Sequence, residues 1–195
     1  MRLTTPRIAP ADLSSLTEAQ QAVLAPLMGR RPAGGVGPVL NIFRTLAHAP
    51  DALTAFLAWG SYILSKKNDL PQREREIVIL RIGYLCRSGY EWTQHVEIGL
   101  RCGLTGDEVA RIKAGPEAPG WSAADRALLQ ASDELHHDHF VSSPTWADLR
   151  SHFGEKACMD VVFTAGQYTQ VSMMLNSFGV QLDEGQVLDP DLKGF

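Results

Sequence analysis

Glu91 and His95 are the two residues of this sequence whose types and spacing most directly suggest chemistry. Because they are four residues apart on a predicted helix, their side chains share one face. A carboxylate beside an imidazole raises the proton affinity of the ring and orients it. Such a pair can move a proton to and from a bound carbon acid or oxygen. Glu76 can join the pair if its helix folds back on theirs as an antiparallel hairpin, and Tyr90 can donate a hydrogen bond beside them.

A Glu–His pair at this spacing is also common in salt bridges on helix surfaces, so the pair alone identifies no reaction. Here the pair lies among aromatic and aliphatic residues, including Tyr90, Trp92 and Val96, which favours burial. Buried titratable groups are costly unless they pair, and such pairs are enriched at functional sites. We therefore predict that Glu91 and His95 belong to a functional site.

The elements that position these residues are predicted to be helices, because apolar residues recur at helical spacing and strand alternation is nearly absent. The fold class is therefore all-α. We expect a single domain over residues 1–195, with a motif-bearing core at about 50–115, a second helical half at about 121–182 and a C-terminal tail at 183–195. The predicted helices span approximately residues 18–28, 41–47, 50–67, 72–85, 90–102, 106–115, 123–136, 144–153 and 155–178.

Several helix boundaries have local signals. Thr17 with Gln20, and Thr105 with Glu108, have the spacing of capping boxes, which predicts a helix start at each. Pro71 suits the first turn of the helix that carries Glu76. Residues 30–38 are rich in Pro and Gly and predict a loop. Residues 75–99 and 155–179 share a charged start, a mid-helix Gly and a Tyr, which suggests an ancient duplication.

Composition excludes several classes of protein. The chain has 195 residues, of which 45% are hydrophobic, so it can bury a core and is not expected to be disordered. A net charge of −4 argues against a nucleic-acid partner. The N-terminal residues lack the apolar stretch of a signal peptide, and no apolar run approaches the roughly 20 residues that a membrane helix needs. We therefore expect a soluble, cytoplasmic protein with no membrane partner.

Neither cysteines nor histidines suggest a metal or cofactor. Cys86, Cys102 and Cys158 contain no Cys-x-x-Cys and indicate reduced thiols. The run His136–His139 ends a predicted helix, where consecutive side chains point in different directions, and no second cluster at ligand spacing accompanies it. We expect these histidines to interact with the helix dipole. His136 can still approach the site, given the Asp-Glu-Leu-His sequence in which it stands.

The region around the pair resembles the core of the carboxymuconolactone decarboxylase family, which includes the alkylhydroperoxidase D-like proteins. The likeness extends from about residue 40 to 182. It implies an all-α, alkylhydroperoxidase D-like helical bundle that assembles as a homotrimer or homohexamer and works without a metal. The matching segments are Arg73-Glu74-Arg75-Glu76, Tyr90-Glu91-Trp92-Thr93-Gln94-His95-Val96, Asp133-Glu134-Leu135-His136 and Phe163-Thr164-Ala165-Gly166-Gln167-Tyr168-Thr169.

The resemblance also indicates which residues of this sequence correspond to the site residues of the family. In the peroxidase branch, a Glu at a helix start, a Cys-x-x-Cys and a His form a redox site; the Glu and His correspond to Glu76 and His95. The two cysteine positions hold Ser88 and Glu91 here. Without an attacking thiolate and a resolving thiol that cycle cannot run. Cys86 is close to these positions, but we expect it to be a small buried residue.

The decarboxylase branch fits the remaining groups better. We expect a cofactor-independent decarboxylase-type enzyme that acts on a small anionic or lactone substrate, with His95 as acid or base oriented by Glu91 or Glu76. The alternatives are an alkylhydroperoxidase D-like peroxidase and a non-catalytic oligomeric protein that binds a ligand. Residues expected to contact the substrate are Tyr90, Ser88, Arg81 and His136. Most arginines near the motif (Arg73, Arg75, Arg81 and Arg87) are expected to form ion pairs at the helix surface or between subunits.

Overall fold

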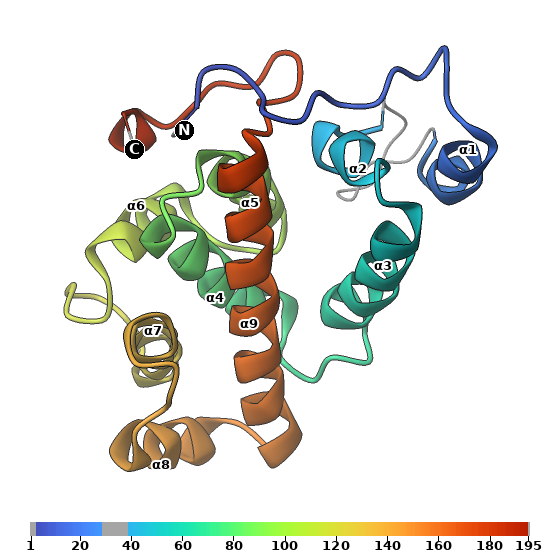
Figure 1. Ribbon diagram of the computed structural model, residues 1–195. Coiled ribbons are helices and arrows are strands. Elements are labelled where there is room, and N and C mark those ends of the chain that lie inside the picture. The colour runs from blue at the N-terminus through green and yellow to red at the C-terminus, as the bar shows by residue number, and fades with distance from the viewer. Residues whose placement is uncertain (1–2, 29–38, 195) are drawn as a thin grey trace.

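The computed structural model describes residues 3–28 and 39–194, and every regular element in these ranges is helical, which confirms the all-α prediction (Figure 1). The loop predicted over residues 30–38 lies outside the described residues. The elements are α1 (Glu18–Leu24), η1 (Ala25–Leu27), α2 (Asn41–Leu46), α3 (Pro50–Leu64), α4 (Gln72–Leu85), α5 (Gly89–Arg101), α6 (Gly106–Ala114), α7 (Ala123–His137), α8 (Ser143–His152), α9 (Glu155–Phe178) and η2 (Pro190–Leu192).

Most predicted boundaries agree with the structure. Thr17 and Thr105 each form both hydrogen bonds of a capping box, so both predicted helix starts are confirmed. Pro71 differs from the prediction, because its extended ψ of 153° makes it the N-cap of α4 and not part of the first turn. Helix α3 ends at Leu64, three residues early, where the Ser65 hydroxyl accepts a hydrogen bond from the Lys67 N–H and supports a turn.

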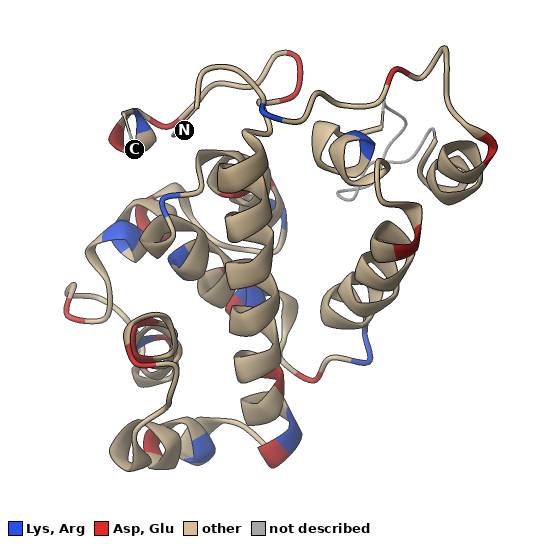
Figure 2. Cartoon of the chain, in the orientation of Figure 1, with Lys and Arg blue, Asp and Glu red and all other residues tan. Residues whose placement is uncertain are grey.

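Helix α4 lies at the centre and packs against α5, α7 and α9 (Figure 1). All its residues from Arg75 to Gly83 are buried. Helix α9 has no Lys, Arg, Asp or Glu from Val161 onward (Figure 2). From Val161 onward only a narrow stripe of α9, which includes Gly166, Gln170 and Met173, is exposed, and the rest of the helix is buried or half-buried.

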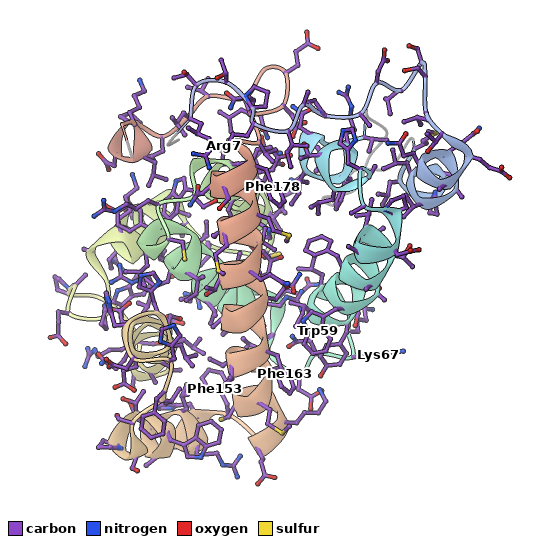
Figure 3. All side chains as sticks on the ribbon, in the orientation of Figure 1. Arg7, Trp59, Lys67, Phe153, Phe163 and Phe178 are labelled. Carbon is purple, nitrogen blue, oxygen red and sulfur yellow. The ribbon has the colours of Figure 1, made fainter. Side chains whose placement is uncertain are left out.

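Helices α1 to α3 form a layer with its own apolar cluster on one side of α9, while α7 and α8 lie on the opposite side (Figure 1). Helix α3 joins the rest of the molecule at α9. There Trp59 packs edge-on against Phe163, with ring centroids 5.6 Å apart (Figure 3). The main core draws on α3 to α9, so the motif-bearing helices are enclosed by packing from both halves of the sequence.

The suggested duplication is not a structural repeat. Residues 75–99 form two helices and a turn, whereas residues 155–178 form one continuous helix of 24 residues. No helix in the described ranges is long and apolar enough to cross a membrane.

Candidate proton-transfer site

A tight turn folds α4 and α5 into an antiparallel hairpin, which is the condition that the sequence set for Glu76 to reach the Glu91–His95 pair. Arg87 has a left-handed φ of 53°, and the Ser88 N–H donates a hydrogen bond to the Gly83 carbonyl at 2.9 Å. Helix α5 then begins at Gly89 and runs back along α4. Glu76, near the start of α4, is thereby brought opposite His95 in the middle of α5.

Glu76, His95 and Glu91 meet in the interior and are called the Glu–His–Glu site below. His95 Nδ1 lies 2.7 Å from Glu76 Oε2 in an aligned hydrogen bond. His95 Nε2 lies 2.9 Å from Glu91 Oε1, but the ring N–H is not aimed at that oxygen, which has no hydrogen-bond partner. The side chains are 8%, 1% and 5% exposed for His95, Glu76 and Glu91. The structure therefore excludes the alternative of a surface salt bridge.

The charges of the site fix the protonation state of the ring. Burial alone would lower the pKa of His95, but the two carboxylates outweigh it and raise the pKa to about 10. At neutral pH His95 is therefore an imidazolium. Since Nδ1–H is engaged by Glu76, Nε2–H is the proton that the ring can deliver to a bound molecule.

The stems of the two carboxylates lie opposite glycines of the neighbouring helix. A Cβ atom at Gly83 of α4 would be 3.5 Å from Glu91 Cγ, and one at Gly99 of α5 would be 3.7 Å from Glu76 Cβ. The Gly99 position is tighter still, because the same Cβ would be 2.9 Å from Leu104 Cδ1. Each carboxylate stem thus packs against a glycine of the opposite helix.

Tyr168 of α9 is a site residue that we did not predict. Its ring meets the His95 ring edge-on, with centroids 4.9 Å apart. Burial, with the charges of Glu91 and Glu76, raises the pKa of its hydroxyl well above the ordinary value. Tyr168 is therefore a neutral phenol that can donate a hydrogen bond to a developing oxyanion. The sequence signal was only its place in the family-like segment 163–169.

Ser88, an expected substrate contact, lies at the start of α5 next to this site. It is the N-cap residue, is fully buried, and its Oγ has no hydrogen-bond partner. The side chain is therefore positioned to bind a ligand without breaking an existing bond. Its role as a contact stays a prediction.

Arg81 and Tyr90 correct our expectations. Arg81 points to the other side of α4, where its guanidinium binds both Asp133 oxygens and the Ile112 and Lys113 carbonyls. The Tyr90 hydroxyl donates to Asp183 at 2.6 Å, and burial and the Asp183 charge raise its pKa well above the ordinary value. Both side chains are held by structural partners, so neither is presented to a substrate.

His136 also departs from its expected role. It belongs to α7, which packs mainly against α4, α8 and α9. Its Nδ1 lies 3.6 Å from Cys86 Sγ, and its ring contacts His137. Burial and the neighbouring His137 lower its pKa, so the ring is neutral at pH 7. His136 is thus part of a thiol–imidazole pair and not of the Glu–His–Glu site.

The described residues contain no group of three or more His, Cys, Asp or Glu side chains arranged to hold a metal ion. None of the three cysteines forms a disulfide. The chemistry that the Glu–His–Glu site itself offers is proton transfer from a buried imidazolium beside a neutral phenol.

Comparisons with known proteins agree with the resemblance. Residues 50–134 match the family model of the carboxymuconolactone decarboxylase family. No curated protein is significantly similar to the sequence. Solved structures share the fold. An uncharacterized peroxidase-related protein from Ralstonia eutropha JMP134, described as an alkylhydroperoxidase AhpD core, has a TM-score of 0.78 at 20% identity over 92% of this chain and 93% of its own.

Two further structures show the same fold. The debrominase Bmp8 in complex with 2,3,4-tribromopyrrole has a TM-score of 0.74 at 15% identity, over 93% of this chain and 94% of its own. An uncharacterized peroxidase-related protein from Silicibacter sp. TM1040 has a TM-score of 0.71 at 14% identity, over 94% and 92%. Residues 50–134 are therefore similar to the carboxymuconolactone decarboxylase family, and the chain has the all-α fold of these alkylhydroperoxidase AhpD-like structures.

Proposed function

We propose that this protein is a cofactor-independent decarboxylase-type enzyme that acts by acid–base chemistry on a small carboxylated lactone. The observation that carries the proposal is the buried imidazolium of His95, held between Glu76 and Glu91. The family match supports the substrate class, because the reaction for which the family is named consumes such a lactone. The absence of cysteine at the positions of Ser88 and Glu91 argues against the peroxidase cycle of related proteins.

The proposed step needs an acid more than a base. The bond between the substrate carbon and its carboxylate breaks, carbon dioxide leaves, and the electron pair spreads into the conjugated lactone. His95 then delivers its Nε2 proton to carbon, which gives the enol-lactone, and solvent restores the proton. Glu76 fixes the ring through Nδ1, and Tyr168 stabilises the lactone oxygen as negative charge develops on it.

Loss of carboxymuconolactone absorbance on addition of the enzyme tests the proposal. His95→Asn and Glu91→Gln should each lower turnover by about 10²-fold or more, because each removes or misplaces the acid. Glu97→Gln is the matched control. Glu97 also lies on α5, but its side chain is 65% exposed, and among the described residues its ion pair is with Arg101, one turn later on the same helix. Near wild-type rates in both site variants would refute the proposal.

A second candidate is supported by the Cys86–His136 contact of 3.6 Å. A neutral imidazole can take the proton of a thiol, and the thiolate can attack a hydroperoxide, giving an alcohol and a sulfenic acid that an added thiol reduces. Peroxide consumption that depends on thiol and disappears in Cys86→Ser, but not in Cys102→Ser, would favour this activity.

A protein with neither activity would be a non-catalytic ligand-binding member of the family. The assembly as a trimer or hexamer also stays a prediction, which light scattering of the purified protein measures.

A further inference from the structure

Arg75 is a buried arginine for which the described residues provide no carboxylate at ion-pair distance. It is 4% exposed, and its side chain has one hydrogen bond to the described residues, from Nη1 to the Ser65 carbonyl at 3.3 Å, while its Nε has no partner among them. Its neighbours Arg73 and Arg81, in contrast, both bind aspartates. A guanidinium this buried is costly unless its donors are satisfied, so the position of Arg75 requires an explanation.

Arg75 lies in the same region as the Glu–His–Glu site. Its positive charge and the negative charges of Glu76 and Glu91 all act on the hydroxyl of Tyr168. The Ser65 carbonyl that accepts its hydrogen bond follows the end of α3. The guanidinium therefore lies near Tyr168, where α3, α4 and α9 meet.

Other buried polar atoms without partners gather along this contact. On α9, Thr164, Gln167 and Ser172 are each at most 5% exposed, and Thr164 lies one turn before Tyr168. Gln167 faces Gly60 of α3, where a Cβ atom would meet only its amide nitrogen, at 4.0 Å. We call the partnerless groups of α4 and α9 at this contact the polar seam; it comprises Arg75 Nε, Thr164 Oγ1, Gln167 Oε1 and Ser172 Oγ.

Such a concentration is unusual, because buried polar atoms in folded proteins almost always have hydrogen-bond partners. In the part of the chain that the structure describes, eight buried side-chain atoms lack a hydrogen-bond partner, and four of them belong to the polar seam. The seam offers a cationic donor, hydroxyl groups that can donate or accept, and an amide acceptor. This donor set matches a small ligand that carries a carboxylate and further oxygens.

We propose that the polar seam binds a small carboxylate and that Arg75 is its anchor. The planar fork of a guanidinium matches a carboxylate with two parallel hydrogen bonds. When His95 is protonated, the two negative charges of Glu76 and Glu91 are matched by the two positive charges of His95 and Arg75. The net charge of these four groups is then zero, so together they do not repel a bound anion. The inference rests on the proposed function and deepens it: Arg75 holds the carboxylate that the substrate keeps, while the other is lost beside His95.

Titration calorimetry with cis,cis-muconate and with its uncharged dimethyl ester tests the anchor. The wild-type protein should bind the dianion and not the ester. Arg75→Gln should weaken muconate binding by at least about 30-fold, and Arg75→Lys by less, because it keeps the charge but loses the fork. Arg101→Gln is the control, since this exposed arginine of α5 pairs only with Glu97. Equal affinity in Arg75→Gln and wild type, or no binding by wild type, would overturn the inference.

Thr164→Val provides a test that does not disturb a buried charge. Removing a buried hydroxyl that has no partner should leave the thermal stability unchanged or raise it slightly, whereas muconate binding should weaken by about threefold to tenfold. Thermal unfolding of every variant accompanies the titrations, so a folding defect in Arg75→Gln is recognised. Wild-type affinity in Thr164→Val would remove α9 from the binding site.

Turnover separates this inference from the proposed function. Muconate binding that depends on Arg75, without any conversion of carboxymuconolactone, would leave the anchor in place and refute the decarboxylase proposal. Turnover that depends on His95, with an unchanged KM in Arg75→Gln, would refute the anchor alone. If both hold, Arg75→Gln should raise KM far more than it lowers kcat.

Discussion

The starts of α5 and α6 carry the same local pattern but use it differently. Ser88 and Glu91 have the capping-box spacing of Thr105 and Glu108, yet only the second pair forms the box. Glu108 returns to the Thr105 N–H at 2.8 Å, whereas Glu91 turns toward His95 and Ser88 caps nothing. A missing cap costs a helix about 1 kcal/mol. Helix α5 therefore gives up local stability where Glu91 serves the site.

The largest expected difference between the two helix starts is that the α5 start, through its pairing of Glu91 with His95, makes the stability of the protein depend on pH, whereas the α6 start does not. The pKa of His95 is raised from 6.5 to about 10 on folding. Protonated His95 therefore makes its full contribution to the free energy of unfolding below about pH 6.5, and this contribution is lost as the pH rises through 10. At about 1.4 kcal/mol per pKa unit, the free energy of unfolding should fall by several kcal/mol over this range. Urea denaturation at a series of pH values measures the decline.

Two variants make this measurement specific. His95→Gln should remove the slope between about pH 8 and pH 10, while Thr105→Ala, which weakens only the α6 cap, should keep it. If wild type and His95→Gln lost stability in parallel, the charged imidazole would not be the cause.

The next largest effect is on turnover. Glu91→Gln should lower carboxymuconolactone turnover by about 10²-fold. Glu108→Gln should leave turnover within about twofold but reduce the free energy of unfolding by about 1–2 kcal/mol, because Glu108 completes a cap and also pairs with Arg73. Turnover rates and urea denaturation midpoints of both variants show which variant loses activity and which loses stability. Similar turnover losses in the two variants would mean that the helix starts do not differ in function.

A tertiary anchor accounts for the stability of α5 without its cap. Asp183 accepts hydrogen bonds from the Tyr90 hydroxyl at 2.6 Å, the Gln94 amide at 2.7 Å and the Asn41 N–H at 2.8 Å. Asp183→Ala should reduce the free energy of unfolding by about 2 kcal/mol, since it leaves the buried Tyr90 hydroxyl without an acceptor for its proton. Asp191→Ala, which removes an exposed partner of Lys113, should change it by less than about 1 kcal/mol. Equal losses in the two variants would show that Asp183 is no anchor.

The smallest expected effect concerns the two cap residues themselves. Thr105→Ala should cost about 1 kcal/mol of unfolding free energy because it removes a formed cap. Ser88→Ala should cost nearly nothing, because its buried hydroxyl has no bond to lose. Thermal unfolding of the pair measures the difference. A loss in Ser88→Ala as large as that in Thr105→Ala would contradict the contrast between α5 and α6.

The sequence predicted the features that depend on neighbours along the chain. Helical periodicity and the capping boxes are local, so the helix positions could be inferred, and with them the possibility of an α4–α5 hairpin. The hairpin in turn implied that Glu76 could reach His95. The cap at Ser88 shows the limit, since a correct local pattern is overruled once Glu91 finds a buried partner.

Features that depend on distant partners could not be inferred. Arg81 is bound to α6 and α7, and Tyr90 to a residue 93 positions later, so nothing in their local sequence excludes substrate contact. Tyr168 reaches His95 only through the packing of α9 on the hairpin. Arg75 was expected to form an ion pair like Arg73, and only the structure shows that no carboxylate of the described residues lies within reach of it.

The bond between Tyr90 and Asp183 has a consequence for how the protein is made. Tyr90 leaves the ribosome 93 residues before its partner, and nascent chains fold as they emerge. Until Asp183 appears, the first turn of α5 has neither a local cap nor its remote anchor. The imidazolium centre is thus completed only after Asp183 has been synthesised. A product truncated just after α9 would contain Glu76, Glu91 and His95 without the support that holds α5 in position.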